Sequence, residues 1–507
     1  MHSLAIAPKA GRLANLRIAV IVAGIGCSGL IEPHKVPASL QVVAGLGQTD
    51  TIGVWLSIPL TISVHNTKGK PAIQTPVTFT VQPMPGVSTA PALVKPTTYV
   101  YFAGPQTAMK EWTDSSGHTA VTVLFGAVAG SFKIAIDGND LAVHDTVSYT
   151  ILPGHAVRIT TSPTDSALYV GASYRVRSQV LDRAANVRPD SVYFRVDSST
   201  AVATVQASGS ITGAAIGRAR VRLSLADSSL VTAARVTVVP QGTLGVDMAG
   251  YALDWGLARV NLDGSGHRLL VSAPNSYTPF PSWSPDASNI VYNTGDVFSG
   301  RLMRVDTLGH VSAIQHSGTL SSETWPRYSY DGKYIYYTAG YYPDSLDSYR
   351  INSDGSGTPL LVTPPRTVSE RFWKASPSPD GSLVAFTVAG SAVSLVSTSD
   401  GSLRVLSTPT SAESPRFSPD GTWIAFVDEE NRQLHVVHPD GSGFRTLTPP
   451  GLTVDHWGHD WSPDGAWIVI RADGTGDQLA IVRVSDGLLL PLPYARDMFE
   501  PTWRPVP

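Results

Sequence analysis

The sequence predicts an all-β protein, and three observations lead to this fold class. Apolar and polar residues alternate over many short runs, a pattern typical of half-buried strands. The 45 glycines and 38 prolines punctuate these runs, as expected for strands joined by tight turns. One turn motif also returns at intervals of 40 to 49 residues through the C-terminal half, and such a period indicates a repeat architecture.

The composition excludes several classes of protein. The chain has 507 residues, which favours about three domains over a single core. Charged residues make up 15% and apolar residues 42%, values that exclude a coiled coil and a disordered chain. The formal net charge of -3 provides no positive field for nucleic acid. A single cysteine, Cys27, allows no internal disulfide and no zinc site of several thiolates. We therefore expect no nucleic-acid partner and no cofactor.

The first 27 residues have the pattern of an export signal. Three basic residues precede an apolar run over residues 18–25, which is too short to span a membrane. Cys27 follows closely, and the arrangement resembles the lipobox of bacterial lipoproteins, in which the cysteine is diacylated and becomes the new N-terminus. Gly24 stands where the lipobox usually has leucine, so an ordinary signal peptide beside a cysteine is the alternative.

Both alternatives predict export to the periplasm, the outer membrane or the cell surface. Lipidation of Cys27 would be the single membrane attachment of the chain. Residues 28–39 contain two prolines and are expected to form a flexible tether.

Residues 40–153 contain about seven short alternating runs, the number expected for an Ig-like β-sandwich. Residues 60–64 and 77–81 are two of these runs. Residues 113–123 and 129–134 resemble the second half of an invasin-type bacterial Ig-like domain, in which an acidic-Gly turn and an Ala-Gly step flank two late strands. We therefore expect a first sandwich of the invasin type.

Residues 154–241 predict a second sandwich. Gly209 and Gly213 bracket a short apolar and polar alternation, and Gly217 permits a turn into the next strand. With Phe194 before a Ser-Ser pair, the segment resembles a group 2 bacterial Ig-like domain nearly from end to end. Neither sandwich shows a catalytic constellation. The resemblance implies a stalk or an adhesive module.

The remaining residues repeat one turn. Its general form is Ser-Pro-Asp-Gly, in which proline presets φ, aspartate caps the turn and glycine accepts a positive φ. An apolar alternating strand follows each copy, and a second Asp-Gly turn comes later in most units. This arrangement predicts four strands per unit, as in a propeller blade. The aspartates of the five copies are Asp286, Asp331, Asp380, Asp420 and Asp464.

The ends of the repeat region predict how the ring closes. Residues 258–271 form a partial unit that lacks an innermost strand, and residues 501–505 supply only such a strand. Joining them gives a six-bladed β-propeller with a shared closing blade. The two turns that recur in phase over residues 244–507 resemble the TolB-type WD40-like propeller family. The missing Gly-His and Trp-Asp pairs exclude ordinary WD repeats.

Candidate binding residues lie where the repeats predict a channel mouth. Histidine and carboxylate side chains gathered there would form a metal site, with His456 and His459 as its weak candidates, whereas the alternative is a solvated polar rim with both histidines exposed. The repeat register predicts that the following residues share this face: Glu323, Lys374, Glu413, Asp455, His456, His459, Asp460 and Glu500.

These patterns favour a binding function over catalysis. The chain has no Gly-x-Ser-x-Gly elbow, no His-Glu-x-x-His helix and no Walker-type loop. We expect a monomer that is not an enzyme, with a propeller that binds an envelope or extracellular protein or glycan and Ig-like domains that serve as a stalk. The alternative is a metal-assisted polysaccharide lyase or hydrolase that uses the channel mouth. A third class, structural surface assembly, would require self-association.

Overall fold

The structure is a computed structural model of the whole chain. All regular elements among the residues described below are strands, as the predicted all-β class requires. None of these residues belongs to a helix that is long and apolar enough to cross a membrane. The predicted export signal and Cys27 lie outside the described residues. The structure describes residues 37–97, 105–138, 143–248, 256–273, 280–295, 299–316, 322–341, 345–363, 372–388, 392–473 and 478–506.

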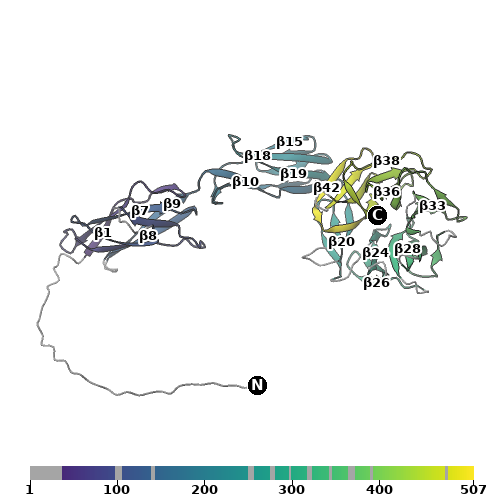
Figure 1. Cartoon of the computed structure of the whole chain (residues 1–507), viewed down its shortest axis with the longest axis horizontal. Helices are drawn as coiled ribbons and strands as arrows, with labels where there is room; N and C mark the ends of the chain where they lie inside the picture. Colours follow the sequence, from purple (N-terminus) through teal and green to yellow (C-terminus); the bar gives the residue numbers. More distant parts are fainter. Residues whose placement is uncertain are drawn as a thin grey trace, which may run out of the picture. The chain divides into compact units, whose positions relative to one another are not determined.

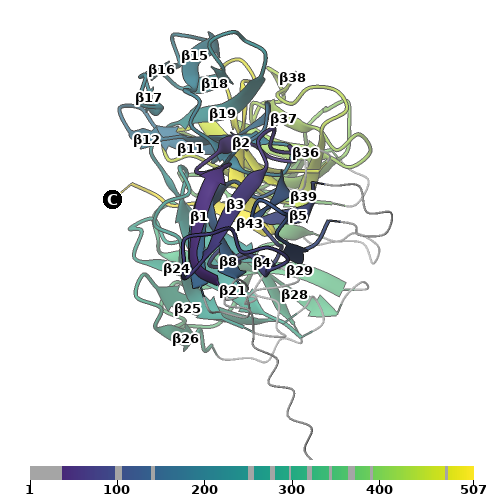
Figure 2. The same ribbon diagram turned by 90° about the vertical axis from the view of Figure 1, so that its left-hand side faces the viewer.

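The chain divides into two compact units, of which the first holds Met1–His155 and Asp182–Val187. Its nine strands are β1 (Pro37–Ala44), β2 (Thr49–Thr51), β3 (Leu60–Asn66), β4 (Pro76–Val81), β5 (Ala92–Pro96), β6 (Ala108–Trp112), β7 (His118–Phe125), β8 (Gly130–Gly138) and β9 (Val143–Leu152). They form two sheets, ordered β1-β3-β7-β5 and β2-β9-β8-β4-β6, around one apolar core. Figure 2 shows β1 beside β3. Alternate residues of β7 are buried, which is the pattern of a sandwich strand.

The first strand begins earlier than the sequence predicted. β1 starts at Pro37, within the segment expected to be a tether, so that prediction is wrong for residues 37–39. β1 is the edge strand of its sheet and pairs only with β3. Proline is tolerated at the start of an edge strand, because no neighbour there needs its missing N–H.

The second unit begins with a further set of strands, which forms the Ig-like fold predicted for this part of the chain. Its strands are β10 (Ala156–Ser162), β11 (Asp165–Tyr169), β12 (Ser173–Arg175), β13 (Arg177–Asp182), β14 (Val187–Arg188), β15 (Tyr193–Ser198), β16 (Ala203–Val205), β17 (Ser210–Gly213), β18 (Gly217–Ser224) and β19 (Val231–Val239). The main sheet has the order β11-β19-β18-β15. Gly209 has a φ of +80°, and a Cβ there would lie 2.9 Å from the Val176 carbonyl oxygen, so the hairpin requires glycine at this position.

Six four-stranded antiparallel sheets follow in the same unit (Figure 1). The first sheet combines β20 (Thr243–Met248), β21 (Gly256–Asn261) and β22 (Arg268–Ser272) with β43 (Met498–Trp503) from the end of the chain. The others are β23 (Ser282–Trp283), β24 (Asn289–Thr294), β25 (Arg301–Asp306) and β26 (Val311–Ala313); β27 (Glu323–Tyr328), β28 (Tyr334–Tyr341), β29 (Ser345–Asn352) and β30 (Leu360–Leu361); β31 (Trp373–Pro377), β32 (Leu383–Thr387), β33 (Ser394–Ser397) and β34 (Leu403–Val405); β35 (Ala412–Phe417), β36 (Ile424–Asp428), β37 (Leu434–Val437) and β38 (Arg445–Thr446); and β39 (Thr453–Trp461), β40 (Trp467–Asp473), β41 (Gln478–Arg483) and β42 (Leu489–Arg496).

The six sheets close into a ring. The innermost strands β43, β23, β27, β31, β35 and β39 each contact the next in this order, and β39 contacts β43 again. β43 pairs antiparallel with β20, which is the pairing expected of a closing strand. Tyr169 and Ile216 of the Ig-like fold pack against the core formed by the first and last sheets.

The repeated turns have a common hydrogen-bonding pattern. In every copy the serine hydroxyl donates to the aspartate two residues later, as from Ser378 to Asp380 at 2.6 Å. The same serine oxygen accepts the N–H of the residue five positions on, as from Leu383 at 2.9 Å. The turn glycines have φ between +67° and +73°, and Ala287 takes a φ of 58° in the copy that lacks glycine.

Candidate functional site

One residue recurs at the same point of each repeat, in the innermost strand or just before it. In five copies this residue lies six positions before the turn aspartate, and β43 supplies the sixth. Ladder irregularities accompany it in five of the six sheets, and bulges of this kind redirect a side chain. We call the following six residues the axial positions: Phe280, Trp325, Lys374, Ser414, Gly458 and Glu500.

Five of the six axial positions are strained. Phe280, Trp325, Lys374, Ser414 and Glu500 all have φ between 45° and 61°, a region that non-glycine residues rarely adopt. Such strain persists only where the surrounding structure enforces it, and it concentrates at functional sites. At Gly458 a Cβ would lie 2.6 Å from the Glu500 Cα, so no larger residue fits there.

Three aromatic rings and one ammonium group gather at one end of the axis. We call Phe280, Trp325, Trp457 and Lys374 the aromatic mouth. The Trp325 and Trp457 rings are 7° from parallel with centroids 6.4 Å apart, and the Phe280 ring lies 5.3 Å from that of Trp325 and 6.2 Å from that of Trp457. Lys374 Nζ lies 4.6 Å from the Trp457 ring centroid, within cation–π range. Trp457 remains 39% exposed.

Lys374 is also half of a buried ion pair. Its Nζ lies 2.9 Å from Glu413 Oε2, and it approaches the His456 carbonyl oxygen at 3.5 Å. Both side chains are largely shielded from water, which strengthens the attraction between them and makes an unpaired partner costly. The pair therefore holds the ammonium group against the tryptophans.

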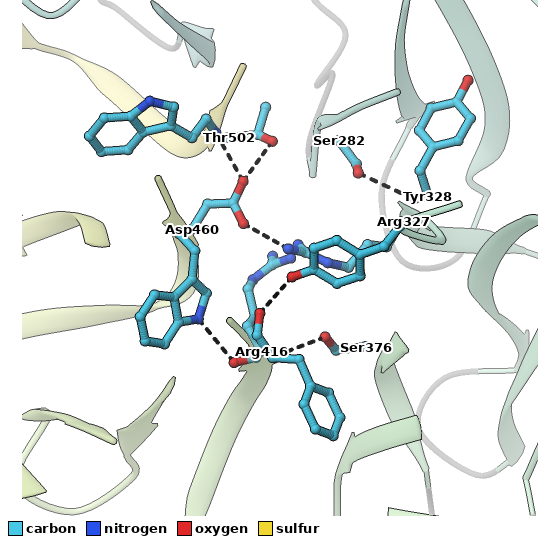
Figure 3. Close-up of polar contacts among 11 residues, drawn as sticks. Ser282, Arg327, Tyr328, Ser376, Arg416, Asp460 and Thr502 are labelled. Carbon is cyan, nitrogen blue, oxygen red and sulfur yellow. Dashed lines mark hydrogen bonds and ion pairs between the residues drawn. The ribbon is translucent and has the colours of Figure 1, made fainter. Parts of the chain in front are cut away.

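Deeper along the axis a second ion pair crosses the ring (Figure 3). Arg327 Nη2 donates to Asp460 Oδ1 at 2.7 Å, and the other oxygen of Asp460 accepts from the Thr502 hydroxyl at 3.0 Å and the Trp503 N–H at 2.9 Å. The Tyr330 hydroxyl donates to the Phe417 carbonyl at 2.7 Å, and burial raises the pKa of Tyr330 to about 12.

This network separates two cavities. The cavity at the aromatic mouth has about 20 Å³, and the one on the other side, walled by Trp283, Trp461 and Trp503, has about 240 Å³. Arg327 lines both of them. The Arg327 side chain therefore lies between the two cavities.

The predicted site residues do not all meet at the mouth. Lys374 and Glu413 lie there as a pair, and Glu500 occupies an axial position, where it accepts the N–H of Phe280. Asp460 lies deeper, as described above. The structure therefore brings together only part of the predicted set.

Three of the predicted residues are engaged elsewhere. Glu323 lies two residues before its axial position, 2.7 Å from His316 Nε2. Asp455 pairs with Arg471 at 2.8 Å. His459 has no exposed surface, so the alternative that left it exposed on a rim is wrong. Burial lowers the pKa of His459 to about 4, which keeps the ring neutral at pH 7.

The two histidines do not form a metal site with the neighbouring carboxylates. His456 lies beside Trp457, with ring centroids 4.6 Å apart, whereas His459 occupies the position that proline takes in four of the other innermost strands. Within the described part of the chain, no group of three or more His, Cys, Asp or Glu side chains is placed to hold a metal ion.

Sequence reasoning missed the aromatic residues and the arginines of the axis. It selected charged residues near the start of each innermost strand, whereas the residue with the unusual backbone geometry lies at a fixed distance before the turn. The signal that identifies this residue is its spacing of six from the turn aspartate. The missed residues are Phe280, Trp325, Arg327, Tyr330, Arg416 and Trp457.

Comparisons with known proteins identify one domain. Residues 156–238 match the family of bacterial Ig-like domains, group 2. This segment is a group 2 bacterial Ig-like domain. The match confirms the predicted resemblance to group 2 Ig-like domains, whereas the bounds 154–241 and the type of the first sandwich stay predictions. No curated protein is similar in sequence to the chain.

Solved structures resemble the chain at low identity. TolB from Acinetobacter baumannii shares 19% identity over 62% of this chain and 83% of its own, with a TM-score of 0.44. An oligogalacturonate lyase from Vibrio parahaemolyticus shares 14% over 52% of this chain and 82% of its own, with a TM-score of 0.35. An oligogalacturonate lyase in complex with manganese shares 16% over 68% and 99%, also with a TM-score of 0.35.

Proposed function

We propose that this protein is an exported binding protein whose aromatic mouth contacts a protein or glycan of the cell envelope or its surroundings. In this proposal the six sheets are the blades of a TolB-type propeller. The invasin-type sandwich and the group 2 domain form a stalk, and Cys27 carries a lipid anchor.

The observation that carries this proposal is the aromatic mouth. Trp457 is partly exposed, and it lies beside two groups held on strained backbone, the Trp325 ring and the buried Lys374 ammonium group. Aromatic residues held in this way dominate binding energies, because they bury a large area while losing little conformational freedom. A rigid aromatic surface beside a charge suits recognition of a flat or extended ligand.

The geometry favours binding over metal-assisted catalysis. A lyase or hydrolase of that kind requires several ligands that converge on one ion, and the described residues hold no such group. Lys374 and Glu413 bond to each other, so neither is poised to accept a proton from a substrate. The lyase or hydrolase alternative therefore gains no support from these side chains.

The test is a binding measurement on two matched variants. Trp457→Ala removes the exposed ring of the mouth, and Trp112→Ala removes a ring that is 60% exposed on the first sandwich. Binding of each variant to panels of purified envelope polysaccharides and envelope proteins is measured by surface plasmon resonance. Trp457→Ala should lower the affinity for the ligand at least tenfold. Trp112→Ala should bind like the wild type. Equal binding by both variants would reject the mouth as the binding site.

The anchor is tested on the mature N-terminus. Mass spectrometry of protein from the native envelope should find a diacylglyceryl group on Cys27, and Cys27→Ser should release the protein from membranes. A free thiol at Cys27, or an intact segment of residues 1–27, would contradict the anchor and leave the binding proposal standing.

A further inference from the structure

Arg416 is a cationic side chain of the axis that lacks a partner. It extends from β35 into the same central region as the Arg327–Asp460 pair (Figure 3). Its Nε is buried and makes no hydrogen bond, and among the described residues no carboxylate lies within 4.0 Å of its guanidinium. Arg416 as a whole is only partly buried, so its guanidinium has no acidic partner in the protein and is not sealed from a ligand.

The carboxylates of the axis are bonded to other groups. Asp460 pairs with Arg327, and Glu413 pairs with Lys374. Glu500 accepts the N–H of Phe280. The resting protein therefore leaves Arg416 without an anion, although its planar fork is suited to bidentate binding of a carboxylate.

The cavity beside Arg416 limits what reaches it. Arg416 lines the cavity of about 20 Å³ together with Trp325, Lys374 and Trp457. That volume holds about one water-sized group. A sugar ring is too large for this cavity, whereas the carboxylate at the end of a peptide chain is narrow. With the carboxylate at Arg416, the side chain of the last peptide residue would lie among the aromatic rings. Capture of a C-terminal carboxylate is a known mode of peptide recognition.

We infer that Arg416 binds the C-terminal carboxylate of a peptide or protein partner, with the last side chain of the partner packed against Phe280, Trp325 and Trp457. This inference rests on the proposed function and specifies its ligand. The site binds reversibly, and no bond forms or breaks.

The experiment compares small peptides that differ only in the C-terminal group. N-acetyl-Gly-Phe and its C-terminal amide are titrated into the full-length protein by isothermal calorimetry, with methyl glucuronide as the sugar-acid probe. The acid should bind at least tenfold more tightly than the amide, and methyl glucuronide should not bind. Arg416→Met should abolish binding of the acid, and Arg416→Lys should weaken it. Arg404→Met, which removes an exposed arginine of β34, should leave the binding unchanged.

Thermal unfolding separates a ligand-binding arginine from a structural one. Without ligand, Arg416→Met should melt no lower than the wild type, because it removes no ion pair with an acidic side chain and keeps most of the apolar stem. A lower melting temperature would show a structural role and overturn the inference, as would equal binding of acid and amide or preference for the glucuronide. If Arg416→Met still binds the peptide acid while Trp457→Ala no longer binds the envelope ligand, this inference fails and the proposed function stands.

Discussion

The turns and the axial positions of the ring differ in one respect that matters for function. The turns repeat the same chemistry, since each of the five serines donates to an aspartate two residues later. The axial positions, of which five lie six residues before a turn aspartate, differ in chemistry. Their side chains are aromatic, cationic, hydroxyl-bearing or acidic, and the glycine has none. Repeated positions therefore build the scaffold, and variable positions that share one backbone geometry form the site.

The division is not complete, because one variable position also stabilises the ring. Asp460 lies two residues after an axial position and accepts hydrogen bonds from three groups, of which Arg327 belongs to a sheet on a different part of the ring. Axial chemistry therefore contributes to closing the ring as well as to binding.

The largest expected effect comes from Asp460→Asn. The substitution leaves the buried Arg327 without a counter-ion, which costs about 3–5 kcal/mol in the free energy of unfolding. Asp464→Asn, four residues along the chain, removes only turn hydrogen bonds and should cost about 1 kcal/mol. Urea unfolding of both variants measures the difference. Equal losses would show that the ion pair contributes no more than a turn.

A smaller effect is expected at a repeated turn. Asp380→Ala removes the acceptor of Ser378 and Ser382 and should lower the free energy of unfolding by about 1 kcal/mol. The hydrogen bond from Ser378 holds the pKa of Asp380 below 3.8, its ordinary value. The stabilisation is therefore complete above that pH and is lost as the pH falls below it. Urea midpoints at pH 6 and pH 2.5 should differ less for Asp380→Ala than for the wild type, and an unchanged difference would reject this assignment.

The smallest expected effect concerns metal. Because His456 has no converging ligands among the described residues, calorimetric titration with Zn²⁺ or Mn²⁺ should give the same result for the wild type and for His456→Ala. Stoichiometric uptake by the wild type that the variant loses would restore the lyase or hydrolase alternative.

The sequence predicted the scaffold well, because its signals are local. Turn chemistry and strand alternation located the strands that follow each turn, such as β32 and β40. The group 2 domain was also predictable from the sequence, because its hairpin requires glycine at position 209. The start of β1 was missed because Pro37 argues against a strand unless the edge position is known.

The site was only partly predictable. Strand alternation assigns faces with a period of two, and a bulge interrupts that period just where the axial side chain emerges. The repeat register predicted Glu323 at the mouth, but Glu323 contacts His316, and Trp325, two residues later, takes the axial place. The pairing of Arg327 with Asp460 joins residues 133 apart and depends on closure of the ring.

Variable residues at the axis are expected to bind the ligand, whereas the repeated turn residues stabilise the ring. One crossed measurement tests this division, in which Arg416→Met and Asp380→Ala are each titrated with N-acetyl-Gly-Phe and unfolded in urea. We expect Arg416→Met to lose the peptide and keep its free energy of unfolding, whereas Asp380→Ala should bind the peptide normally and lose about 1 kcal/mol of that free energy. Parallel loss of peptide binding and of stability in both variants would contradict this division between binding and stabilising residues.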